Sequence, residues 1–350
     1  MEQKTFDPDG VGVATGTYFG LPFEPEDAAL VLISAPWDVT VSYGAGTAYA
    51  PDAVIEASTQ LDFHEPLAPG AWRRGIATAD IDYSIQEQSQ RLRSEAERVI
   101  DHLEGGGSID DDYVVRKIRR VNEGCRAMNA NIEAQAAQWL DQGRLVGLVG
   151  GDHSTPYGLI RALGARRPSF GILHIDAHRD LREAYEGFEY SHASIMYNVL
   201  RDVASVRRLV QVAVRDFSAG EAGRAAADER VVSFEDLELA GARFRGETWD
   251  EQCRRIVAEL PDEVYVSFDI DGLSFDNCPH TGTPVCGGMS FNEAVWLLRT
   301  LVESGRRIIG FDVVEVCPSP EGRIDAITGA RILWKLCSLT LLSNDPENRK

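Results

Sequence analysis

The sequence predicts a three-layer α/β/α fold in a single domain, built on a mainly parallel sheet of about eight strands. Short apolar segments rich in β-branched residues alternate along the chain with longer segments of helical period. Such continuously apolar strands are expected where helices cover both faces of a parallel sheet. No Pro-, Gly- or Ser-rich linker divides the 350 residues. One α/β core is therefore a simpler interpretation than two average domains.

The predicted elements begin with a polar, Gly-rich arm over residues 1–27, which is expected to pack on the body or on a neighbouring subunit; the domain itself is placed at residues 28–345. Each predicted strand is short and apolar, and the eight lie at 30–34, 75–81, 145–149, 170–175, 208–214, 230–233, 264–270 and 307–313. In parallel sheets, ligands bind beyond the carboxyl ends of such strands.

The predicted helices lie between these strands. One begins at Pro51, whose fixed φ suits the first helical turn, and a long one over 113–141 ends at Gly143. An acidic segment with three glycines, 104–112, is predicted to be a surface loop. The remaining helices are expected near 155–164, 192–203, 218–227, 249–259, 290–304 and 326–341.

The composition limits the classes of partner. A net charge of −20 argues against nucleic acid and anionic membrane surfaces, which require a basic surface, and is compatible with a cationic substrate. No apolar run approaches the ~18 residues of a membrane span. The six cysteines are widely spread, without a CxxC pair or a secretory leader, so we expect reduced thiols in a cytoplasmic protein.

Histidines and carboxylates gather in one stretch. Four of the seven histidines lie between residues 150 and 192. They are interleaved with acidic residues, in the order His153, His174, Asp176, His178, Asp180 and His192. Another acidic pair, Asp269 and Asp271, ends a later strand. Residues two apart share a face of a strand, so each set can converge, and the donors suit two Mn²⁺, Ni²⁺, Fe²⁺ or Zn²⁺ ions about 3.5 to 4 Å apart.

Three motifs carry a family resemblance: Gly-Gly-Asp-His-Ser at 150–154, Asp-Ala-His-Arg-Asp at 176–180 and Ser-Phe-Asp-Ile-Asp-Gly at 267–272. Together with segments 281–284 and 312–316, they resemble the ureohydrolase family of arginases, agmatinases and guanidinases, over roughly residues 28 to 340. The resemblance implies two divalent ions, Ni²⁺ or Mn²⁺, in an arginase-like fold that assembles as a trimer or hexamer. It implies that the first ion is held by His153, Asp176, Asp180 and Asp269, and the second by Asp176, His178, Asp269 and Asp271.

The resemblance also implies a reaction. The two ions would activate a water that attacks a guanidinium carbon, releasing urea and an amine. His192 would protonate the leaving amine, Glu315 would accept hydrogen bonds from the guanidinium, and Thr283 would assist in substrate binding, with Asp180 counted among the catalytic groups. A purely structural role remains an alternative for three of these residues. His192 could pack on the tyrosines, Glu315 could form an ion pair with an arginine, and Thr283 could be a turn residue before Pro284. His174 is expected to support a ligand.

The loop 181–190 bears on the substrate because it supplies three aromatic residues with acidic neighbours and lacks the Asn- and Ser-rich character of arginases. This favours a compact cation such as guanidine or metformin, as in the guanidinase-like branch that includes biguanide hydrolases. The alternatives are agmatinase or guanidinobutyrase activity, a mainly structural subunit in a mixed oligomer, and a relative that cleaves acetylated amines with one zinc.

Overall fold

The computed structural model describes residues 6–346 and contains one eight-stranded sheet in the order β2-β1-β3-β8-β7-β4-β5-β6. All of its strand pairs are parallel. The strands are β1 (Leu30–Ala35), β2 (Ile76–Thr78), β3 (Leu145–Gly150), β4 (Phe170–Ile175), β5 (Val206–Val212), β6 (Val231–Phe234), β7 (Glu263–Asp269) and β8 (Arg307–Val314). The predicted α/β fold with about eight parallel strands is confirmed.

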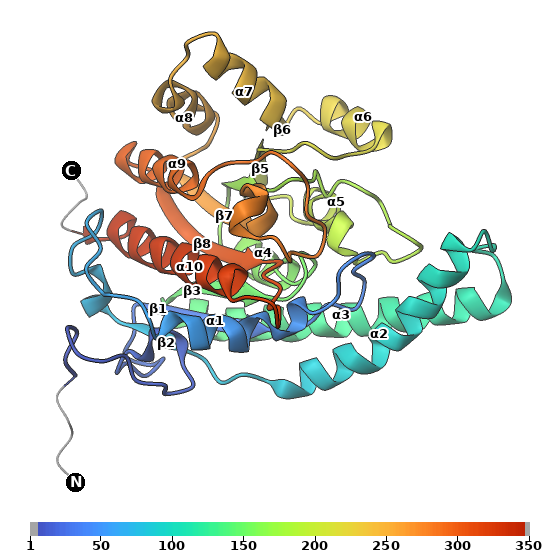
Figure 1. The fold of residues 1–350 in the computed structure, drawn as a ribbon, viewed down its shortest axis with the longest axis horizontal. Coiled ribbons are helices and arrows are strands. Elements are labelled where there is room, and N and C mark those ends of the chain that lie inside the picture. The colour runs from blue at the N-terminus through green and yellow to red at the C-terminus, as the bar shows by residue number, and fades with distance from the viewer. Residues whose placement is uncertain (1–5, 347–350) are drawn as a thin grey trace.

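Helices cover both faces of this sheet (Figure 1). They are α1 (Ala50–Ser58), α2 (Tyr83–Glu104), α3 (Asp112–Asp141), α4 (Tyr157–Gly164), α5 (Ile195–Asp202), α6 (Ala219–Ala227), α7 (Asp236–Phe244), α8 (Trp249–Ala258), α9 (Phe291–Glu303) and α10 (Ile324–Ser343). Alternate residues of β1 enter different cores. Leu30 and Leu32 belong to the core that also contains residues of α1, α8, α9 and α10, whereas Val31 and Ile33 belong to the core that contains residues of α2, α3, α4 and α5. A strand buried on both faces therefore reads as a continuous apolar run.

Two helices, α2 and α7, were not predicted from the sequence. Helix α2 is mostly polar and buries only a narrow stripe, which includes Ile85 and Val99, against α3. The two helices approach so closely that a Cβ added to Gly124 of α3 would lie 2.1 Å from Leu92 Cδ1. Helix α7 buries Leu239 and Ala242 alone. Both helices depend on tertiary packing, because an apolar stripe this narrow gives a weak helical signal. The α2–α3 hairpin extends beyond the sheet in Figure 1.

The predicted N-terminal arm packs on the body of its own chain over the residues that the structure describes. Tyr18 and Phe19 are buried. The Tyr18 hydroxyl lies 2.8 Å from Ser34 Oγ, and the Phe19 N–H donates to Ser58 Oγ. Residues 1–5 of the arm lie outside the described residues, and the domain boundary at 28 stays a prediction. Within residues 6–346 no helix combines the length and apolarity needed to cross a membrane.

Candidate active site

The site residues follow the carboxyl ends of four neighbouring strands, β3, β8, β7 and β4. His153 comes three residues after β3, Asp176 directly follows β4, Asp269 ends β7 and Glu315 directly follows β8. The prediction that these distant segments meet at one rim of the sheet is therefore correct in its geometry. The predicted reason was wrong for residues 176–180. Because β4 ends at Ile175, these residues converge through a loop, in which Asp180 has a φ of 54°, and not through the alternation of a strand.

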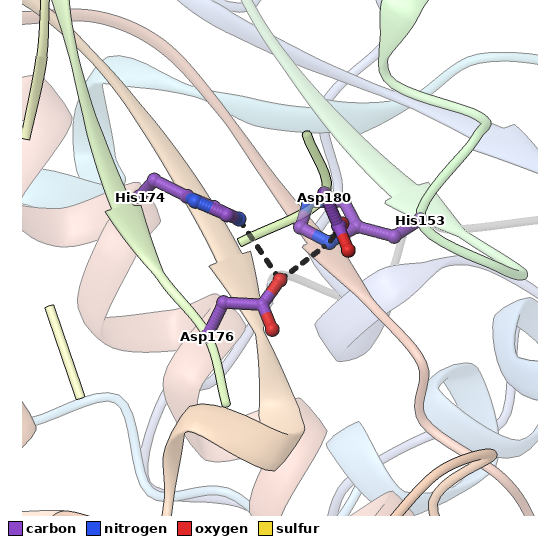
Figure 2. A group of neighbouring side chains, drawn as sticks. All are labelled: His153, His174, Asp176 and Asp180. Carbon is purple, nitrogen blue, oxygen red and sulfur yellow. Dashed lines mark hydrogen bonds and ion pairs between the residues drawn. The ribbon is translucent and has the colours of Figure 1, made fainter. Parts of the chain in front are cut away.

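A first cluster surrounds the imidazole of His153. Its Nδ1 lies 2.9 Å from Asp176 Oδ2, 3.0 Å from Asp180 Oδ2 and 3.3 Å from Asp269 Oδ2. This buried nitrogen makes no hydrogen bond among the described residues, while Nε2 lies 2.9 Å from Ser267 Oγ. Figure 2 shows Asp176 and Asp180 pointing toward His153. Ser267 thus orients the ring so that Nδ1 faces the carboxylates.

A second cluster adjoins the first. His178 Nδ1 lies 3.1 Å from Asp271 Oδ2 and 3.4 Å from Asp176 Oδ1. Asp271 Oδ2 is buried without a hydrogen-bond partner in residues 6–346, whereas Asp271 Oδ1 accepts the Ala177 N–H. The two oxygens of Asp176 therefore face different clusters. Asp269 differs from Asp176 in this respect. Its Oδ2 faces His153, but its Oδ1 accepts the Asp271 N–H.

The donor set of both clusters fits divalent cations. Burial and the neighbouring carboxylates of Asp271 and Asp176 raise the pKa of Asp269 well above its ordinary value. Burial and Asp176 likewise raise the pKa of Asp180 to about 6. Several buried carboxylates this close together are unfavourable without a compensating positive charge. Each cluster also holds one buried polar atom without a hydrogen bond, and both atoms are of types that ligate metals.

His174 lies within reach of the first cluster but both of its ring nitrogens are engaged. Its Nε2 lies 2.9 Å from Asp176 Oδ2, the contact drawn in Figure 2, and its Nδ1 lies 3.0 Å from Gln211 Nε2. Because the amide of Gln211 donates to Nδ1, Nε2 carries the proton and donates to Asp176. His174 thus holds Asp176 in place, as the sequence led us to expect, and Gln211 is a contributor that sequence reasoning missed.

A cavity of about 360 Å³ opens beside the two clusters. It is lined by Ser42, Tyr43, His178, Asp180, Arg182, Tyr185, His192, Ala193, Asp216, Phe217, Glu221, Thr283, Pro284 and Val285. The lining of this one cavity therefore includes four of the predicted site residues, namely His178, Asp180, His192 and Thr283. The cavity gives a small molecule access to the clusters.

Glu315 is buried and is not among the residues that line this cavity. Its Oε1 accepts the backbone N–H of His153 at 2.9 Å, and its Oε2 is buried without a partner in the described chain. Burial and the nearby Asp152 raise the pKa of its carboxyl well above the ordinary value. The alternative role of Glu315, a structural ion pair with an arginine, finds no such pair within residues 6–346. The unpaired oxygen leaves this carboxylate able to accept a hydrogen bond.

His192 begins a short 3₁₀ turn, His192–Ser194, before α5, where the sequence had predicted one continuous helix. Its backbone N–H donates to Thr40 Oγ1 at 3.3 Å, and its ring meets that of Tyr185 edge-on with the centroids 6.1 Å apart. Burial, followed by the neighbouring His178 and His153, lowers the pKa of His192 to about 3. The imidazole is therefore neutral where it faces the cavity.

The arginase-family model matches residues 28–338 of this sequence, the segment that contains both clusters and the cavity. The chain belongs to the arginase family. It is accordingly a ureohydrolase, an enzyme that hydrolyses C–N bonds in amidines.

Relatives within the arginase family span nearly the whole chain. The sequence is 30% identical to an agmatinase of Neisseria meningitidis over 328 residues, 91% of this chain and 89% of that protein. It is 28% identical to an N(1)-aminopropylagmatine ureohydrolase of Thermococcus kodakarensis over 316 residues, 89% of this chain and 90% of that protein. The fold resembles that of a proclavaminate amidino hydrolase from Streptomyces clavuligerus, with a TM-score of 0.70 and 22% sequence identity. The match covers 94% of this chain and 97% of that one.

The loop 181–190 does not form the aromatic and acidic wall expected for this arginase-family enzyme. Only Tyr185 of its three aromatic residues lines the cavity; Phe188 is buried in the core, and Tyr190 packs on Tyr157. Its glutamates are not among the lining residues either, and Glu189 lies near Arg126 and Arg201. The loop instead brings Arg182 into the cavity.

Asp216, Phe217 and Glu221 also line the cavity and were not predicted as site residues. A signal was present, since they follow β5 at the same rim of the sheet that carries the metal-ligand motifs. Glu221 also belongs to a capping box with Ser218 at the start of α6. That motif explains a structural role for Glu221 but gives no indication of the cavity.

Proposed function

We propose that this arginase-family enzyme is a binuclear-metal hydrolase that cleaves the guanidinium C–N bond of a linear guanidino compound and releases urea and an amine. The observation that carries this proposal is the pair of imidazole and carboxylate clusters that share Asp176 and border a cavity. Paired metal sites of this kind activate water and clamp a reacting group between them.

The comparisons support an agmatine-type substrate better than the predicted guanidine or metformin. Two relatives that this chain matches over about 90% of their length are named agmatinase and aminopropylagmatine ureohydrolase. The sequence argument for a compact cation rested on the aromatic and acidic loop, which contributes one aromatic ring and one arginine to the cavity. We therefore propose a substrate with an alkyl chain attached to the guanidinium group.

The proposed metal ligands are His153, Asp176, Asp180 and Asp269 for one ion, and Asp176, His178, Asp269 and Asp271 for the other. Manganese or nickel suits such mixed imidazole and carboxylate sites. When bound, the two cations would lower the pKa of a water so that hydroxide is available near neutral pH. Asp180 additionally lines the cavity, which is why we count it among the catalytic groups.

The other polar groups of the site suit a guanidinium substrate. Glu315 Oε2 can accept an N–H of the guanidinium, which would offset the cost of leaving that oxygen unpaired. Gly282 leaves the space for this contact, because a Cβ there would lie 2.9 Å from Oε2. Thr283 lines the cavity and could bind the substrate through its hydroxyl. His192 lines the cavity and would pass a proton to the leaving nitrogen.

We further propose a trimer or hexamer, of this chain alone or with a second subunit. A purely structural role in a mixed oligomer is disfavoured because the complete set of proposed ligands converges in the described residues. The one-zinc alternative is disfavoured because the carboxylates and imidazoles form two clusters.

The deciding experiment uses the purified chain, stripped with a chelator and reconstituted with Mn²⁺ or Ni²⁺. Urea release is measured with guanidine, metformin, agmatine, guanidinobutyrate and arginine, together with the metal-to-protein ratio. We expect about two ions per chain and turnover of an alkylguanidine. A metal-free preparation with undiminished activity, or one ion per fully active chain, would refute the binuclear mechanism. Preferred cleavage of guanidine or metformin would restore the first substrate prediction.

A further inference from the structure

Arg182 is the one arginine that lines the active-site cavity within residues 6–346. It lies two residues after the proposed ligand Asp180, and its backbone N–H donates to Ala193 O, next to His192. Its backbone is thereby fixed between the metal cluster and the proposed proton carrier. Its side chain lines the same cavity as Asp180 and His192.

The guanidinium of Arg182 is held on one side and open on the other. Its Cζ lies 4.7 Å from the centroid of the Tyr185 ring, and its Nε lies 3.5 Å from Glu221 Oε2. The two terminal nitrogens make no hydrogen bond within the described residues, and the side chain is 37% exposed. Stacking on an aromatic ring orients a guanidinium without using its N–H groups. Arg182 therefore presents a positioned pair of donors to the cavity.

The acidic residues nearby leave the two terminal nitrogens of Arg182 without a hydrogen bond in the described residues. Glu221 Oε2 accepts the N–H and the hydroxyl of Ser218, and Oε1 accepts the Leu181 N–H. The carboxylate of Glu221 is thus committed to the start of α6. Asp216 lines the cavity but is exposed and makes no side-chain hydrogen bond in residues 6–346, so it has no fixed orientation. The side chain of Arg182, which contacts Tyr185 and Glu221, therefore has a better defined orientation than that of Asp216.

The open N–H groups of Arg182 favour one class of substrate tail. An ammonium at the far end of an alkylguanidine would approach the positive charge of Arg182, which is unfavourable in a confined space. A carboxylate matches the planar fork of a guanidinium and can bind it through two parallel hydrogen bonds. Because Arg182 is already stacked in place, little conformational entropy is lost on binding.

We propose that Arg182 is a specificity-determining residue that binds the carboxylate of an ω-guanidino acid, so that guanidino acids are better substrates than the corresponding guanidino amines. This inference rests on the proposed ureohydrolase function and deepens it, because it selects the substrate class at the same site. It favours guanidinobutyrate over agmatine, although the curated relatives named above act by name on agmatine-type compounds.

The test compares guanidinobutyrate with agmatine, which carry opposite charges on chains of similar length. With the metal-loaded enzyme we expect kcat/KM to favour the acid by about 10- to 100-fold, the usual range for a hydrogen-bonded charge pair. Arg182→Met should remove most of this preference by raising KM for the acid, and Arg182→Lys should retain part of it. Arg182→Glu should reverse the preference in favour of agmatine.

Controls separate this proposal from the proposed function. Arg254→Met, a change at an exposed arginine on α8, should leave the preference unchanged. Calorimetric titration of the metal-loaded protein with each compound reports binding even where no urea forms, so loss of chemistry and loss of carboxylate recognition are read separately. Tighter binding of agmatine by the unaltered enzyme, or an equal effect of Arg182→Met on both compounds, would overturn the assignment.

Discussion

The two sides of the active site are built differently. The metal-binding side consists of residues at or just beyond strand ends that are buried except for His178, and several are held by neighbouring side chains, as Ser267 holds His153 and Gln211 holds His174. The outer wall of the cavity consists of loop residues that are partly exposed, such as Arg182, Asp216 and Thr283. The sheet thus positions the chemistry, whereas the loops set the shape and charge of the space for the rest of the substrate.

The strongest test of this contrast is Asp176→Asn. Asp176 faces both clusters, so we expect loss of bound metal and a fall in kcat of at least about 1000-fold, more than the 10- to 100-fold typical of groups that only contact a ligand. Metal content and urea release would be measured together. The matched change on the outer wall, Asp216→Asn, should keep both ions. Full metal content in Asp176→Asn would show that the two clusters are not one site.

A second test adds a methyl group beside the buried carboxylate of Glu315. In Gly282→Ala the new Cβ would lie 2.9 Å from Glu315 Oε2 and displace that carboxylate. We expect kcat/KM to fall by about 100-fold, the cost of losing one charge-assisted contact in a buried site, while metal content stays the same. Gly322→Ala is the control, because a Cβ there meets nothing within 4 Å. An unchanged kcat/KM would remove Glu315 from the substrate-binding groups.

A third test removes the hydrogen bond that Ser267 of β7 makes with the proposed metal ligand His153. Ser267→Ala removes the partner of His153 Nε2, so metal affinity should fall by about 10- to 100-fold. The affinity is measured by titration with a competing chelator. Ser338→Ala is matched to it, since Ser338 Oγ is also buried but has no hydrogen-bond partner in the described chain. Equal metal affinities in the two variants would contradict the orienting role of Ser267.

The smallest expected effect is on the outer wall. Thr283→Val keeps the shape of a cavity-lining side chain and removes its hydroxyl. We expect KM to rise by about 3- to 10-fold, the cost of one neutral hydrogen bond, with kcat and metal content unchanged. Steady-state kinetics on the best alkylguanidine would check this. No change in KM would assign Thr283 to the turn before Pro284 alone.

The parts of the fold that could be predicted are those whose signal is local. The strands of the sheet have continuous apolar sequences because both faces are buried, and the motif residues lie at or just beyond the ends of four of them. Helices α2 and α7 were missed because their apolar stripes are narrow and are completed only by neighbouring elements, such as α3 against Leu92. A local pattern cannot report a partner that arrives from elsewhere in the chain.

The sequence alone determined the parallel α/β sheet, the family and the residues that gather at its rim, since strand order and burial constrain residue types directly. Only the tertiary structure decided which oxygens of Asp176 face which imidazole, that Glu315 keeps an unpaired oxygen, and that Arg182 lines the cavity in place of the aromatic and acidic residues of its loop. The physical reason is that loop side chains take their directions from contacts with distant segments, which sequence spacing does not encode.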